Sequence, residues 1–167
     1  ADAAEALVLH QATPGRGAQH RLAVPGGVCE LIDESYNASA VAVTAAIRNL
    51  ANTQPGPNAR RIAVLGDMLE LGAGAPQTHR ALAPVLEEAG VDLVFTVGTL
   101  MAGLYAALPK HMQAGQAESS AVLLPALLAA LRPGDVMLIK GSLSVNMRLL
   151  VDGLKTSGEA EGGSDAL

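Results

Sequence analysis

The chain has 167 residues, a formal net charge of −5, one cysteine and no tryptophan. This length suits a single domain, and the acidic balance argues against a nucleic-acid-binding surface, which needs clustered Lys and Arg side chains. The single cysteine, Cys29, provides neither a disulfide framework nor a cysteine-based zinc site within the chain. No apolar run approaches the roughly 18 residues of a membrane span and we see no signal peptide, so we expect a cytoplasmic protein.

In chain order, the first half of the sequence predicts a hairpin, a helix and a buried strand. The expected elements are a short helix at 3–9, a loop at 10–17, strands at 20–24 and 28–32, a helix after Asn37 that stops before 54–58, and a strand at 61–65. Pro25-Gly26-Gly27 supplies the hairpin turn. Cys29 falls within the second strand, where we expect a buried thiol.

The second half alternates helices and strands. The expected elements are a helix opened by Pro76 and closed by Gly90, a strand at 93–97, a helix at about 99–108, a leucine-rich helix capped by Ser119 or Ser120, a strand at 136–139 and a last helix around 147–154. One further strand has room before the leucine-rich helix. Residues 156–167 are rich in Gly, Ser, Glu and Asp, which predicts a disordered tail.

This alternation predicts an α/β fold: a mostly parallel, doubly wound, Rossmann-like sheet with an N-terminal β-hairpin and helices on both faces. In such folds ligands bind outside the carboxyl ends of the strands. Most of the distinctive polar residues follow strand ends: Asp33-Glu34, Gly66-Asp67, Gly98-Thr99 and Lys140-Gly141-Ser142. We therefore expect the ligand site at this edge of the sheet.

Two adjacent carboxylates, Asp33 and Glu34, end the second strand. Like charges repel, and a buried carboxylate needs a partner, so packing alone does not favour this pair. The acids could bind sugar hydroxyls or a metal, or one could cap the next helix while the other faces solvent. Tyr36 could lie beside a nucleotide or pack as an ordinary tyrosine, and Asn37 could be the helix N-cap.

Three further groups of residues could contribute to the ligand site. Asp67 and Glu70 sit in a loop bounded by Gly66 and Gly72, which suits either an active site or a helix cap, and His79 could face Glu70 or lie on the surface. Lys140 and Ser142 place a cation near a helix start, which suits a phosphate or carboxylate. No Gly-Lys pair or Gly-x-Gly-x-x-Gly motif is present, so phosphates would need another domain, with Arg16 reaching a terminal phosphate.

A receiver domain uses similar residues: an acidic pair, an acceptor Asp, a Thr and a Lys at the last strand end. Asp33-Glu34, Asp67, Thr99 and Lys140 imitate that set. The spacing argues against it, because receivers place two helices between the acidic pair and the acceptor, and only one fits here. The proline that follows the receiver lysine is replaced by Gly141.

Two runs together resemble the C-terminal domain of the Mur ligase family. They are Leu-Ile-Asp-Glu-Ser-Tyr-Asn-Ala at 31–38 and Ile-Ala-Val-Leu-Gly-Asp-Met-Leu-Glu-Leu-Gly at 62–72. Pro-Gly-Arg-Gly at 14–17, His79 and Lys-Gly-Ser at 140–142 fall in the family's order. Within the family, the resemblance is to the branch that adds D-alanyl-D-alanine to UDP-MurNAc-tripeptide; the Asp-Asn-Pro-Arg motif of the diaminopimelate-adding branch is absent.

The resemblance implies an ATP-dependent peptide ligase of peptidoglycan synthesis in the bacterial cytoplasm. ATP would phosphorylate the tripeptide carboxylate, and the amine of D-alanyl-D-alanine would attack the acyl phosphate. The family's N-terminal and central domains would hold the UDP-sugar, the ATP phosphates and Mg²⁺. We therefore expect this chain to be a fragment that is inactive alone. We also expect a monomer. We interpret 1–13 as the remnant of an interdomain linker and 14–155 as the domain. A stand-alone nucleotide-binding module is the alternative.

The resemblance also implies roles for single residues. Glu34 stands where the family binds ribose and more often has Asp, and Asp33, Tyr36 and Asn37 would lie near the nucleotide. Arg16 would lie near the phosphates. A second set is assigned to the substrate side: Asp67, Glu70 and His79 to the dipeptide, and Lys140 and Ser142 to the edge of the site. No metal ligand or catalytic residue is assigned within this domain.

Overall fold

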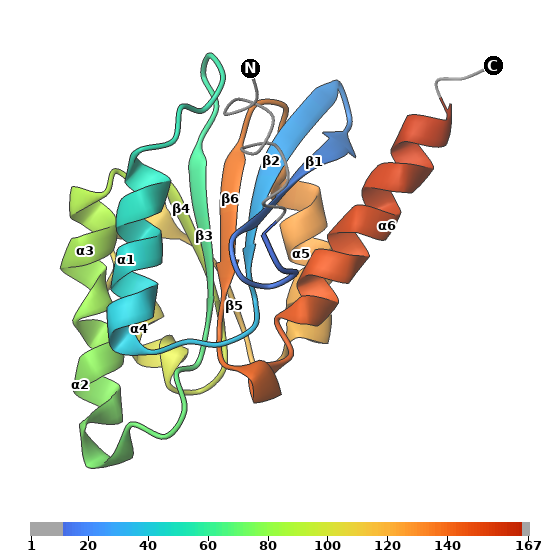
Figure 1. Ribbon diagram of the computed structural model, residues 1–167. Coiled ribbons are helices and arrows are strands. Elements are labelled where there is room, and N and C mark those ends of the chain that lie inside the picture. Colours follow the sequence, from blue (N-terminus) through green and yellow to red (C-terminus); the bar gives the residue numbers. More distant parts are fainter. Residues whose placement is uncertain (1–11, 165–167) are drawn as a thin grey trace, which may run out of the picture.

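The computed structural model describes residues 12–164, with side chains as far as Glu159. The described part forms a six-stranded sheet in the order β1-β2-β6-β3-β4-β5 (Figure 1). The strands are β1 Ala18–Val24, β2 Gly27–Glu34, β3 Arg61–Gly66, β4 Leu93–Val97, β5 Gln113–Ala117 and β6 Val136–Lys140. β1 and β2 pair antiparallel, and every other neighbouring pair is parallel. The predicted α/β fold with an N-terminal hairpin is confirmed, and β5 fills the place left for a further strand.

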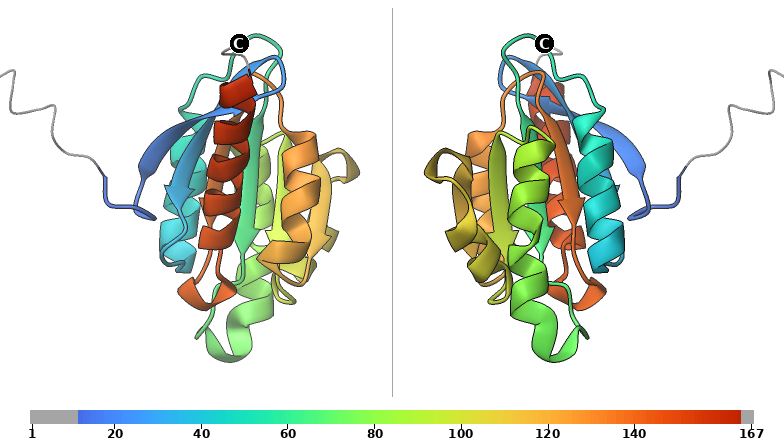
Figure 2. Two further views of the ribbon diagram at one scale, coloured as in Figure 1. Left: turned by 90° about the vertical axis from the view of Figure 1, so that its right-hand side faces the viewer. Right: turned by 90° about the vertical axis from the view of Figure 1, so that its left-hand side faces the viewer.

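Helices cover both faces of this sheet, and Figure 2 shows the two sides. The helices are α1 Ala40–Ala51, α2 Ala75–Arg80, α3 Leu82–Glu88, α4 Met101–Ala107, α5 Ser120–Ala130 and α6 Arg148–Ser164. Short 3₁₀ turns occur at η1 Gly72–Gly74, η2 Lys110–Met112 and η3 Leu143–Val145. None of the helices in the part of the chain that the structure describes is long and apolar enough to cross a membrane.

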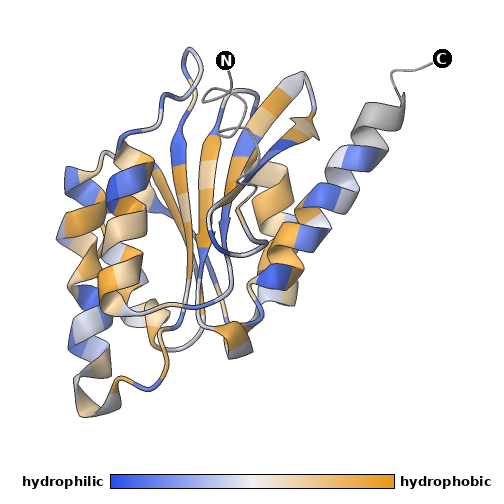
Figure 3. Cartoon of the chain, viewed as in Figure 1, coloured by the Kyte–Doolittle hydropathy of each residue, from blue (hydrophilic) through white to orange (hydrophobic). Residues whose placement is uncertain are grey.

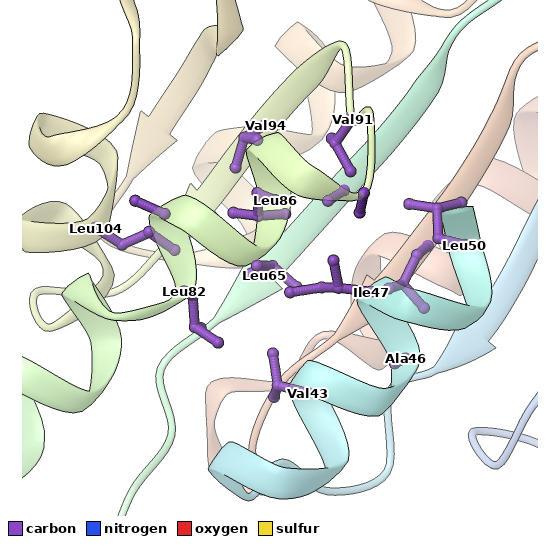
Figure 4. Close-up of a cluster of buried hydrophobic side chains, with 14 of the residues drawn as sticks. Val43, Ala46, Ile47, Leu50, Leu65, Leu82, Leu86, Val91, Val94 and Leu104 are labelled. Carbon is purple, nitrogen blue, oxygen red and sulfur yellow. The ribbon is translucent and has the colours of Figure 1, made fainter. Parts of the chain in front are cut away.

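The core has two halves, one on each face of the sheet. On one face, α1 to α4 pack Val43, Ile47 and Leu86 against the strands (Figure 4). On the other face, α5 and α6 bury Leu123, Leu127, Met147 and Leu150. In Figure 3 orange and blue segments alternate along the helices, as is typical of amphipathic helices with one apolar face. Two thin aliphatic layers around one sheet explain how a core with so few aromatic residues is filled.

Two expectations about local structure need correction. The helix after β3 is two helices, α2 and α3, which meet at Ala81. The N-cap of α1 is Ser39, whose side chain accepts the Ala42 N–H, whereas Asn37 accepts the N–H of Ala38. The capping serine of α5 is Ser119, one of the two candidates. The expected helix at 3–9 lies outside the described residues.

The predicted disordered tail is wrong for residues 156–164, which continue α6. Glycines of α6, one of them within this segment, have a packing role here. Gly158 is buried against β1, where a Cβ atom would come within 3.2 Å of the Ala23 backbone nitrogen. At Gly153 a Cβ atom would lie 2.6 Å from Leu124 on α5. Glycine lets helix and strand approach closely, so composition alone mispredicts this segment.

Candidate functional site

Two hollows lie next to each other at the carboxyl edge of the sheet, which is the lower edge in Figure 1. The first, called here the Glu34 pocket, has a volume of about 190 Å³ and is lined by Gly15, Arg16, Glu34, Tyr36, Asn37, Ala38, Ser39, Ala42 and Lys140. The second, the Glu70 pocket, has a volume of about 480 Å³ and is lined by Tyr36, Asn37, Leu69, Glu70, Ser142, Leu143 and Ser144. Tyr36 and Asn37 line both, so the two hollows are parts of one edge site.

Asp33 lies beneath this site rather than in it. Its carboxylate is fully buried and accepts the Gly15 N–H at 2.9 Å, the Ser35 N–H at 3.1 Å and the Ser35 hydroxyl at 2.5 Å. The Arg148 guanidinium on α6 is 3.9 Å away. These donors offset the cost of burying the charge. Asp33 therefore fastens the 14–17 loop to the end of β2, and its expected place beside the nucleotide is not supported.

Glu34 faces the pocket because side chains alternate along a strand. Cys29, Leu31 and Asp33 point to the α5–α6 face, and Glu34 points to the α1 face. Glu34 is the register partner of Lys140 on β6, and the Lys140 Nζ lies 3.4 Å from Glu34 Oε2. The same Nζ donates to the Asn37 carbonyl at 2.8 Å. Lys140 thus lines the Glu34 pocket.

Arg16 and Tyr36 form the outer wall of the pocket. The Arg16 guanidinium carbon is 4.3 Å from the centre of the Tyr36 ring, a cation–π contact between two exposed side chains. Gly15 makes this approach possible, since it has a φ of +79° and a Cβ atom there would lie 3.1 Å from Tyr36 Cβ. A flat ring and a cation therefore stand within reach of the Glu34 carboxylate. The sequence argument placed both residues at this site, and the structure brings them together.

Asp67 and His79 have internal partners. The Asp67 carboxylate accepts the backbone N–H groups of Met101 at 2.7 Å and Leu100 at 3.3 Å, so it caps the start of α4. His79 is fully buried, and its Nε2 accepts the Met68 N–H at 2.9 Å while Nδ1 donates to the Ala75 carbonyl at 2.6 Å. The expectations that His79 faces Glu70 or lies on the surface are both wrong. These two residues shape the 67–72 loop.

Glu70 and Ser142 do reach the second hollow. Glu70 is exposed and has a left-handed φ of +63°, and the Ser142 hydroxyl accepts the Leu69 N–H at 3.0 Å. Three lining residues were missed by the sequence argument: Leu69, Leu143 and Ser144. Leu69 and Leu143 are 39% and 63% exposed, although leucine normally packs inside. The hydropathy of leucine predicts a core position, and only the geometry of the loops places Leu69 and Leu143 at the rim of the Glu70 pocket.

No group of three or more His, Cys, Asp or Glu side chains suited to a metal ion occurs among the residues that the structure describes. The carboxylates at the edge do not fit a magnesium site, because Asp33 and Asp67 accept backbone N–H groups and Glu34 faces the Lys140 ammonium. Hard cations need several free oxygen ligands. Among the described residues, these three acids do not converge on a common point with several free oxygens.

Comparison with known protein families identifies the family to which the chain belongs. The model of the family described as "Mur ligase, glutamate ligase domain" matches residues 20–143, which include β2 with the acidic pair and β6 with Lys140. The chain belongs to this Mur ligase domain family. The match covers most of the described sheet, and the family expected from the two sequence runs is confirmed.

Relatives within the Mur ligases are named UDP-N-acetylmuramoyl-tripeptide--D-alanyl-D-alanine ligase. Those of Synechocystis and Escherichia coli are each 34% identical to this chain, over 74% and 77% of it. The chain spans about 27% of the length of both relatives.

Solved structures agree with the Mur ligase assignment. MurF ligase from Thermotoga maritima in complex with ADP matches with a TM-score of 0.73 at 22% identity, over 90% of this chain and 32% of that one. MurF from Acinetobacter baumannii matches with a TM-score of 0.72 at 26% identity, over 87% of this chain and 31% of that one. The first likeness, at its low identity, concerns the fold.

Proposed function

We propose that this chain is the C-terminal domain of an ATP-dependent ligase that joins D-alanyl-D-alanine to UDP-MurNAc-tripeptide in peptidoglycan synthesis. The names of the relatives support this activity. The observation that carries the proposal in this chain is the Glu34 pocket, where a carboxylate, an aromatic ring and a guanidinium meet at the carboxyl edge. Ligands of open α/β sheets bind at this edge. The proposed location is the bacterial cytoplasm.

The Glu34 pocket is proposed to bind ATP. A carboxylate accepts hydrogen bonds from two hydroxyl groups, so Glu34 suits the ribose. Tyr36 offers a flat face to the nucleotide, Asn37 borders the same hollow, and Arg16 lies on the outer side, where the phosphates would run. Asp33 supports this set from below by holding the loop that carries Arg16.

The Glu70 pocket is proposed to bind the dipeptide. Glu70 offers a carboxylate for the ammonium group of D-alanyl-D-alanine, and Leu69 and Leu143 offer apolar contacts for its methyl groups. Ser142 fixes the loop through the Leu69 N–H and lines the floor. Asp67 and His79 contribute by holding the same loop in shape. The dipeptide and the nucleotide would then meet across Tyr36 and Asn37.

The chemistry follows from the weakness of a carboxylate as an electrophile. Transfer of the ATP γ-phosphoryl group to the tripeptide carboxylate makes an acyl phosphate and ADP. The dipeptide amine attacks its carbonyl carbon, loses a proton and expels phosphate, which leaves an amide. This chain would supply orientation by closing on the nucleotide and presenting the amine, an effect of proximity. The phosphates and Mg²⁺ are proposed to be held mainly by the central domain of the full-length enzyme.

The domain unit is proposed to start near residue 14, with 1–13 leading to it from the central domain. Its end lies beyond the expected 155, since α6 packs on β1 as far as Gly158. The sequence contains neither a Gly-Lys pair nor a Gly-x-Gly-x-x-Gly motif that would form a phosphate-binding loop. The 167-residue chain alone is therefore expected to release no phosphate from ATP.

The proposal is tested with the full-length protein encoded by the gene that contains this chain. Phosphate release and product mass would be measured with ATP, UDP-MurNAc-tripeptide and, in separate reactions, D-alanyl-D-alanine, D-glutamate, diaminopimelate or lysine. We expect release only with the dipeptide, and a product heavier by the dipeptide less one water. Release with a single amino acid in place of the dipeptide would refute the proposed substrate.

A further inference from the structure

The ammonium group of Lys140 is nearly buried although it borders a polar hollow. The Lys140 side chain is 6% exposed, and its Nζ lies 2.8 Å from the Asn37 carbonyl and 3.4 Å from Glu34 Oε2. A buried ammonium is stable only when acceptors replace the lost water. Both acceptors belong to the Glu34 pocket, so the charge of Lys140 holds two parts of that pocket together.

The two acceptors of Lys140 lie on parts of the pocket that need an anchor to keep one conformation. Glu34 is 29% exposed and has a long side chain that would otherwise sample several rotamers. The Asn37 carbonyl lies in the short connection between β2 and α1, next to Tyr36. Lys140 stands on the neighbouring strand, in register with Glu34, so the sheet itself fixes the anchor.

One oxygen of Glu34 stays available. The Lys140 contact uses Oε2, and within the part of the chain that the structure describes no side-chain hydrogen bond reaches Oε1. Oε1 lies toward Gly17, where a Cβ atom would be 3.5 Å from it. Glu34, which lines the pocket, therefore has one carboxylate oxygen anchored by Lys140 and a second oxygen that can still accept a hydrogen bond.

We propose that Lys140 is a positioning residue, which presents the Glu34 carboxylate to the ribose hydroxyls and thereby sets the preference for ribonucleotides over 2′-deoxyribonucleotides. The proposal rests on the proposed binding of ATP. An acceptor that is fixed before the ligand arrives does not lose its rotamer entropy on binding. Lys140 therefore acts through Glu34 and not by touching the nucleotide.

The test measures the dissociation constants of ATP and 2′-deoxy-ATP for the full-length protein. The variants are Lys140→Met, Glu34→Gln and the double variant, with Lys110→Met as the matched control because Lys110 is exposed and contacts only Gln113 in the described structure. The parent should prefer ATP by at least about tenfold, as a hydrogen bond to a charged group allows. Lys140→Met should reduce this preference to within about threefold, mainly by weakening ATP.

A double-mutant cycle separates positioning from a general effect on the fold. In the Glu34→Gln background, Lys140→Met should change ATP affinity by less than about twofold, because the carboxylate that Lys140 positions is gone. If Lys140→Met weakens ATP and 2′-deoxy-ATP equally and by the same factor in both backgrounds, Lys140 contacts the phosphates or serves stability alone, and the proposal is wrong.

Two other results would distinguish failure of the positioning role from failure of the proposed function. If the parent protein binds ATP without preference for ribose, the positioning role fails while the ligase function stands. If the parent binds no ATP, the proposed function fails and this proposal with it. Should Lys140→Met not fold, Lys140→Arg keeps the charge but replaces the compact ammonium by a planar fork. Its ATP preference should fall below that of the parent, and an unchanged preference would count against the proposal.

Discussion

Two nitrogens of the Arg60 guanidinium bind the Asp135 carboxylate at the amino edge of the sheet. This edge lies opposite the candidate site. Arg60 Nη2 lies 2.6 Å from Asp135 Oδ2, and Nε lies 3.2 Å from Oδ1. Asp135 is fully buried and also accepts the backbone N–H groups of Arg60 and Arg132. This pair ties the residue before β3 to the residue before β6, and Lys140 is the last residue of β6, at the opposite edge.

Breaking that pair should cost stability without changing nucleotide affinity. Arg60→Met leaves the Asp135 charge buried without its cation, and we expect the free energy of unfolding to fall by about 3 kcal/mol. Chemical denaturation would measure it. Arg132→Met is the matched control, since Arg132 contributes only a backbone N–H and should change stability by less than about 0.5 kcal/mol. Equal losses in both variants would contradict the role of the ion pair.

His79 should matter for the 67–72 loop. His79→Ala removes the acceptor of the Met68 N–H and leaves a cavity, so we expect a loss of about 2–4 kcal/mol in unfolding free energy. His111→Ala, at an exposed histidine, serves as the control and should be near neutral. Hydrogen exchange at Met68 should accelerate in the first variant only. An unchanged exchange rate would mean that another group holds the loop.

Tyr36 should contribute a stacking surface to the nucleotide, provided the proposed function holds. Tyr36→Ala should weaken ATP binding by roughly 5- to 100-fold, the range that loss of one aromatic stacking partner produces. Tyr36→Phe keeps the ring and should stay within about threefold of the parent. Tyr105→Ala, on α4, tests for general effects of losing a tyrosine. Calorimetric titration with ATP gives the affinities, and a normal affinity for Tyr36→Ala would exclude stacking.

His20 should make stability depend on pH. Partial burial, with the cation of Lys155 and that of Arg148, lowers the pKa of His20 below 6.5, and Asp33 opposes this. The unfolded chain therefore takes up the proton first as pH falls, so the folded state loses stability below about pH 6.5, by at most about 1.4 kcal/mol per pH unit. His20→Gln should flatten the profile between pH 7.5 and 5.5. Parallel profiles for parent and variant would show that His20 does not contribute.

Cys29 should be inert in the folded protein. Burial raises the pKa of its thiol to about 11, and the carboxylate of Asp135 adds to the effect. Because the thiolate is the reactive form, modification by a disulfide reagent at pH 8 should occur only as fast as the protein opens. Val28→Cys in a Cys29→Ala background places a thiol at a position that is 38% exposed, and should react at once. Rapid labelling of native Cys29 would contradict its burial.

Much of the fold could be predicted because short-range patterns specify it. Apolar runs bounded by glycine and proline gave the strands, and Ser119 marked the start of α5 as a side-chain cap. The tail was mispredicted because a segment rich in Gly, Ser, Glu and Asp has the composition of a flexible chain, whereas the missing side chain of Gly158 is what lets α6 lie on β1.

For the site, the sequence by itself determined that two acids end one strand, that a lysine ends another, and that both ends meet at one edge. The residue pattern alone left Asp33 and Glu34 equivalent, and only the family resemblance pointed to Glu34. The tertiary structure separated them, because alternate residues of β2 face opposite sides of the sheet, and only one side holds the register partner Lys140. Asp33 instead meets the N–H groups of the 14–17 loop. Which acid could reach a ligand was decided by strand pairing over a sequence separation of about one hundred residues, which no local pattern encodes.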